Sequence, residues 1–121
     1  MIAWRSQAKS LLINYLSGSI SNTKMHQTVQ KAIRLVAKEL ENSNVFLLDF
    51  MKVYLGLDGK PHFRPYILHR RNMIKMSMQL MVSLPAAYKM RERLLDLFTI
   101  AFTSVGLFNP FNLEEKGGIP A

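Results

Sequence analysis

Apolar residues recur every three or four positions along most of the chain, which predicts amphipathic helices. The clearest case is Thr23–Leu40, TKMHQTVQKAIRLVAKEL, where a turn of 100° per residue separates an apolar side from a basic side. The apolar side holds Met25, Val29, Ala32, Ile33, Val36 and Leu40, and the basic side holds Lys24, Lys31, Arg34 and Lys38. The three lysines are seven residues apart and therefore form a stripe along the helix.

The same periodicity predicts four more helices, separated by breaks rich in Gly, Pro, Ser and Asn. They cover Ile2–Leu16, Val45–Leu55, Tyr66–Val82 and Pro85–Val105. Ser21 or Asn22 is expected to cap the helix that begins at Thr23, and residues 42–44 are expected to separate it from the next helix. Strand is an alternative for residues 45–55, because Val, Phe and Tyr are strand formers, but Leu and Met favour helix.

Three finer expectations concern side chains. Arg5 and Lys9 are four residues apart on the first helix and form a like-charge pair. Arg91 projects toward the apolar side of the last helix, where it snorkels, pairs with an acid or faces a partner. The fourth helix is rich in methionine, which fits a helix wedged between two neighbours better than an adaptable binding groove. Its two expected stripes are Ile67, Ile74, Met78 and Met81, and Met73, Met76 and Leu80.

These elements predict an all-α protein, a single bundle of about five helices at residues 1–108. A chain of 121 residues suits one core. Residues 109–121 are expected to form an extended or flexible C-terminal tail, which Phe108 and Phe111 attach to the bundle.

Charge narrows the choice of partner. The formal net charge is +8, and no acidic residue occurs before Glu39. A second group of basic residues, Arg70, Arg71 and Lys75, follows the loop GLDGKPHFRP. Within that loop, Phe63 and Arg64 have the composition of a stacking platform for an unpaired base. The alternative is that Phe63 anchors the loop in the core. Such a basic surface fits nucleic acid, an anionic membrane surface or an acidic protein. The candidate phosphate-binding residues are Lys24, Lys31, Arg34, Lys38, Arg64, Arg70, Arg71 and Lys75.

Other chemistry finds little support in the sequence. There is no cysteine, and the three histidines lack neighbours at metal-ligand spacing. Phosphate-cradle and nucleophile motifs and paired acids are missing as well, so we expect no enzyme, no cofactor and no metal. Motifs that read bases are also missing, which leaves backbone contacts without sequence preference. No apolar run reaches the length of a membrane span, and the Ser- and Asn-bearing first helix does not favour a membrane surface. The apolar segment LLINYL near the N-terminus is too short for a signal peptide and contains Asn14, so a cytoplasmic protein is expected.

A cysteine-free, basic chain of five helices and this size resembles the small subunit of class 1, type I CRISPR effector complexes, over Ile2–Phe108. The resemblance implies a non-catalytic subunit present in several copies, which contacts other subunits along the CRISPR RNA and holds a DNA strand without reading its sequence. The residues carried into that role are Lys24, Lys31, Arg34, Lys38, Arg70, Arg71 and Lys75. Two alternatives remain: a helical coat protein of a filamentous virus that wraps DNA, and a basic adaptor that binds an acidic protein.

Overall fold

The computed structural model describes residues 2–57, 66–68 and 72–108, and these residues form helices without strands. The α-helices are α1 (Ile2–Leu16), α2 (Thr23–Ser43), α3 (Val45–Leu55), α4 (Asn72–Leu80) and α5 (Leu84–Ser104), and a 3₁₀ turn, η1, spans Tyr66–Leu68. The prediction of an all-α bundle is therefore confirmed for this part of the chain. The expected tail at residues 109–121, with Phe111, lies outside the described residues.

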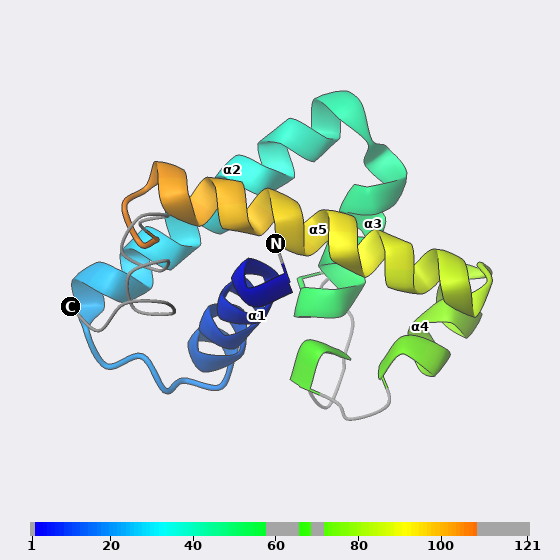
Figure 1. Ribbon diagram of the computed structural model, residues 1–121, viewed down its shortest axis with the longest axis horizontal. Helices are drawn as coiled ribbons and strands as arrows, with labels where there is room; N and C mark the ends of the chain where they lie inside the picture. The colour runs from blue at the N-terminus through cyan, green and yellow to red at the C-terminus, as the bar shows by residue number, and fades with distance from the viewer. Residues whose placement is uncertain (1, 58–65, 69–71, 109–121) are drawn as a thin grey trace.

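Helix α5 is the element against which the other helices pack. Figure 1 shows it running along the long axis of the molecule, with α2 crossing it obliquely, α1 below it and α4 near its N-terminal end. Its Phe98 and Phe102 are fully buried, and their ring centroids lie 5.6 Å apart. Phe108 packs edge-on against Phe102 at 5.4 Å, so the chain turns back onto α5 directly after the helix ends. One core thus joins all five helices.

The ends of the helices follow local signals in the sequence. The Asn22 side chain accepts a hydrogen bond from the Met25 amide at 3.0 Å, which selects Asn22 over Ser21 as the cap of α2. Gly18 and Gly56 take positive φ angles of 79° and 71° just after α1 and α3, as expected for helix-ending glycines. Both helices end where the sequence predicted.

A single residue, Asn44, separates α2 from α3. Its amide donates to the Leu40 carbonyl at 2.9 Å, and its side chain accepts from the Leu47 amide at 3.0 Å. The predicted break at residues 42–44 was therefore too long. Helix α2 continues through Ser43, whose hydroxyl donates to the Glu39 carbonyl at 2.8 Å, a hydrogen bond that helical backbone accommodates.

The predicted continuous helix Tyr66–Val82 was wrong. The structure describes η1 and α4 as two elements, and α4 ends at Leu80. Ile67 is buried, and the Tyr66 hydroxyl donates to the Gln79 side chain at 2.8 Å. These contacts hold η1 against α4 instead of in line with it.

Helix α4 packs against α3, α5 and η1, and only one of its two expected stripes is buried there. Met73 and Met76 are buried and Leu80 is half-buried, as predicted for the second stripe. The remaining members of the first stripe face solvent, with exposed fractions of 52% for Ile74, 74% for Met78 and 92% for Met81. The wedged arrangement expected for this helix is therefore wrong on that side.

Candidate nucleic-acid interface

The basic side of α2 faces away from the core. The opposite, apolar side of the helix is buried at Val29, Ala32, Ile33, Val36 and Leu40. Met25, at the start of that side, is 37% exposed. Lys24, Lys31, Arg34 and Lys38 are all exposed. None of the four forms an ion pair with a carboxylate of the described residues, where Arg5 accounts for every salt bridge. The structure thus brings four of the eight predicted residues together on one helix face.

The spacing of the stripe suits a phosphate backbone. At 1.5 Å of rise per residue, Lys24, Lys31 and Lys38 follow one another at intervals of about 10 Å along the helix. Successive phosphates of one strand of duplex DNA advance by about 3.4 Å along the axis, so each lysine interval corresponds to roughly three phosphates. One face of α2 can therefore contact several phosphates of a strand that runs alongside it.

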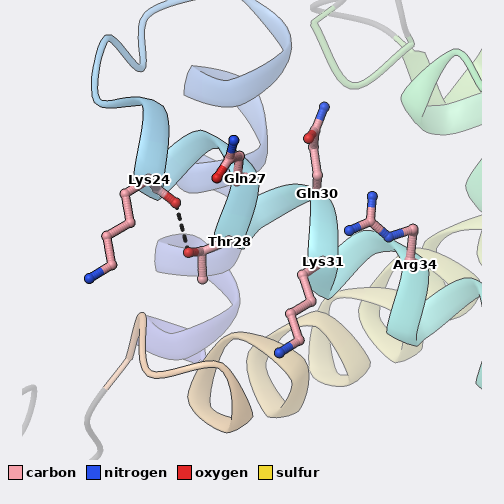
Figure 2. Close-up of a pocket in the computed structure, with 6 residues that line it drawn as sticks. All are labelled: Lys24, Gln27, Thr28, Gln30, Lys31 and Arg34. Atoms are coloured by element: carbon pink, nitrogen blue, oxygen red, sulfur yellow. Dashed lines mark hydrogen bonds between the residues drawn. The ribbon is translucent and has the colours of Figure 1, made fainter.

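A shallow, open hollow of about 470 Å³ lies on this face (Figure 2). The α2 residues that line it are Lys24, Gln27, Thr28, Gln30, Lys31 and Arg34. Figure 2 shows the two lysine side chains extending to one side of the helix and the two glutamines to the other. The Thr28 hydroxyl already donates a hydrogen bond to the Lys24 carbonyl at 2.8 Å. The two sides of this hollow therefore offer ammonium, guanidinium and amide donors along one helix, and these are groups that contact phosphate and sugar oxygens.

Sequence reasoning missed two residues of this surface, Gln27 and Gln30, which share it with the cations. Their angular positions around α2 were available from the sequence, but attention to charge alone passed over them. Leu35, which the sequence places as the one large apolar residue near the basic side, is 41% exposed beside Lys31 and Lys38. An exposed leucine between lysines offers an apolar contact to a sugar or a base next to the bound phosphates.

The other predicted residues do not join this stripe in the described structure. Lys75 is exposed on α4, and Figure 1 places α4 at the opposite end of the molecule from the start of α2. Arg64, Arg70 and Arg71 lie outside the described residues, as does Phe63.

Arg5 does not contribute a free charge. Its guanidinium donates to both carboxylate oxygens of Asp96, at 2.7 Å and 3.0 Å, and lies 3.9 Å from Glu92. The hydrogen bond to Asp96 is the main reason that the pKa of Arg5 is raised above its usual value. The expected pairing of Arg5 with Lys9 was therefore incomplete: Arg5 ties α1 to α5, 91 residues away in sequence.

The described residues contain no group of three or more His, Asp or Glu side chains arranged to hold a metal ion. None of the described helices combines the length and apolar character needed to cross a membrane. Comparison of the chain with protein-family models, with curated proteins and with solved structures gave no match.

Proposed function

We propose that this protein binds a nucleic-acid strand through its phosphates, without sequence preference, and that the basic face of α2 is the contact surface. The observation that carries the proposal is the row Lys24, Lys31, Arg34 and Lys38, exposed and without an ion-pair partner among the described carboxylates. Phosphate contacts made by such a row release counterions, and they supply affinity that does not depend on the bases.

The row is costly for the free protein, which favours a bound anion. Lys31 and Arg34 are three residues apart, and Arg34 and Lys38 are four apart, so both pairs are helix neighbours of like charge. Each such pair destabilises a helix by about 0.2–0.5 kcal/mol. A bound strand of phosphates offsets the repulsion between these cations, because each cation then lies next to an anion. Water alone does not offset it in this way.

A multi-subunit ribonucleoprotein of the CRISPR type is the setting that the sequence resemblance suggests for this activity. The exposed apolar side chains Ile74, Met78 and Met81 support contacts with other protein subunits, because a cluster of this kind is unusual on an isolated surface. A DNA-wrapping coat protein shares both features. A subunit of an effector complex needs its partners to assemble on DNA, whereas a coat protein polymerises on DNA by itself.

The test is a fluorescence-anisotropy titration with labelled single-stranded DNA, single-stranded RNA and duplex DNA, each in two unrelated sequences. We expect similar affinities for the two sequences of each type, and a log–log dependence on salt that is linear between about 50 and 200 mM. A strong preference for one sequence, or no binding at the lowest salt, contradicts the proposal. Displacement by polyglutamate as readily as by unlabelled DNA points to the adaptor alternative.

A further inference from the structure

A second basic site lies between α1 and α5, apart from the α2 stripe. Here the two helices leave a pocket of about 350 Å³. It is lined by Arg5, Ser6 and Lys9 of α1 and by Arg91, Glu92 and Leu95 of α5. A volume of this size is at the lower end of the range for small-molecule sites, enough for an anionic group with a small organic part.

The carboxylates around this pocket are already engaged. Asp96 receives both hydrogen bonds from Arg5, and Glu92 lies within ion-pair distance of the same guanidinium. Lys9 and Arg91 have no ion-pair partner among the described residues. Arg5 balances only one of these two carboxylates, so Lys9 and Arg91 together leave this region with a net charge of +1.

Arg91 is held in place by its own helix. Its guanidinium carbon lies 5.0 Å from the centroid of the Tyr88 ring, a cation–π contact one turn away. Arg91 is half-buried, so the sequence correctly marked it as unusual, although stacking on an aromatic ring was not among the alternatives considered. A stacked guanidinium loses little freedom on binding, and its planar fork matches phosphate oxygens.

Lys9 is also half-buried, and it faces a like charge. Burial, and to a lesser degree the charge of Arg91, lower the pKa of the Lys9 ammonium. Two unpaired cations that share a partly enclosed pocket destabilise the free protein, and an anion placed between them removes that penalty.

We propose that this pocket binds a phosphate monoester. The Lys9 ammonium and the Arg91 fork, which Tyr88 holds in place, supply charge-assisted hydrogen bonds; the Ser6 hydroxyl supplies a further donor, and Leu95 contacts the organic part. The site does not depend on the α2 surface. The same group can come from a free nucleotide-like ester or from the phosphorylated end of a strand.

The test is isothermal titration calorimetry with adenosine 5′-monophosphate, with adenosine as the control ligand. The variants are Lys9→Met and Arg91→Gln, and Arg93→Gln is the matched control because Arg93 is exposed on α5 outside this pocket. We expect binding of the monophosphate but not of adenosine, and a loss of at least about tenfold in both pocket variants but not in the control. Lys9→Met should also melt at a higher temperature than the parent protein in the absence of ligand, which a purely structural lysine would not produce.

The source of the phosphate is then decided with oligonucleotides that carry a 5′-phosphate or a 5′-hydroxyl. Tighter binding of the phosphorylated strand that disappears in Lys9→Met supports the site and assigns it to strand ends. Equal binding of both strands, with Lys9-dependent binding of the monophosphate, supports the site and assigns it to free esters. The proposal is overturned if the monophosphate does not bind at millimolar concentration, or if Lys9→Met binds it as the parent does.

Discussion

Replacing Lys31, Arg34 and Lys38 with glutamine removes three of the four charges on the α2 face and keeps a good helix former at each position. If each cation contacts one phosphate, the slope of log affinity against log salt becomes shallower by about 2.1 for a single strand and about 2.7 for a duplex. For a single strand, the ratio of the parent's binding affinity to the variant's then falls by roughly 20-fold between about 50 and 200 mM salt. Stability should rise by no more than about 1 kcal/mol, because two like-charge helix pairs are removed and all three side chains are exposed.

The control for this experiment is a variant with the same total charge. Lys52, Lys89 and Arg93 are exposed on α3 and α5, so replacing them with glutamine also lowers the net charge from +8 to +5. Anisotropy titrations over a salt series should give this control the slope of the parent protein. Equal losses of binding affinity and salt slope in both variants would show that the overall charge governs binding, and that the α2 face is not the contact surface. A triple α2 variant that fails to fold by circular dichroism would show that the exposed face was misassigned.

Three further predictions concern the scaffold and are measured by denaturant unfolding. Phe102→Ala removes a fully buried ring and should cost about 3–5 kcal/mol, whereas Ile100→Ala, 66% exposed on the same helix, should cost less than about 0.5 kcal/mol. Asn44→Ala should cost about 1 kcal/mol because the cap of α3 is lost, and Asn42→Ala, whose side chain only reaches back to its own helix, should be nearly neutral. Met81→Gly should raise stability by up to about 1 kcal/mol, because Met81 has a φ of 57°, which glycine adopts more readily. An unchanged Asn44→Ala protein, or a destabilised Met81→Gly protein, would contradict the corresponding local account.

Features that depend on neighbouring residues could be predicted from the sequence. Helices α1 and α3 begin and end where expected, because periodicity and a following glycine are local signals. The division of α2 into a buried side and a basic side was also predictable, since it follows from the helical repeat alone. The candidate surface was therefore available from the sequence to the extent that it lies on a single helix.

Features that depend on packing between distant segments could not be predicted in this way. Arg5 and Asp96 are far apart in sequence, and nothing local indicates that α1 and α5 lie side by side. The division of the predicted helix into η1 and α4 has a related cause, because the hydrogen bond from Tyr66 to Gln79 joins residues 13 positions apart. The stacking of Arg91 on Tyr88 is different: a spacing of three residues on one helix was visible in the sequence and was overlooked.

The uncharged residues of α2 add a further argument to the one that the basic row supplies. Gln27 stands four residues before Lys31, and Gln30 stands four residues before Arg34. An acid N-terminal to a base at this spacing is the favourable orientation on a helix, worth about 0.2–0.5 kcal/mol per pair. Glutamate at either position would therefore stabilise α2 if its outer face did nothing but meet water. The same glutamates would repel a phosphate strand, whereas glutamine keeps the positive potential and adds amide donors. The absence of acids from both positions is what a phosphate-binding face requires, and helix stability alone gives no reason for it.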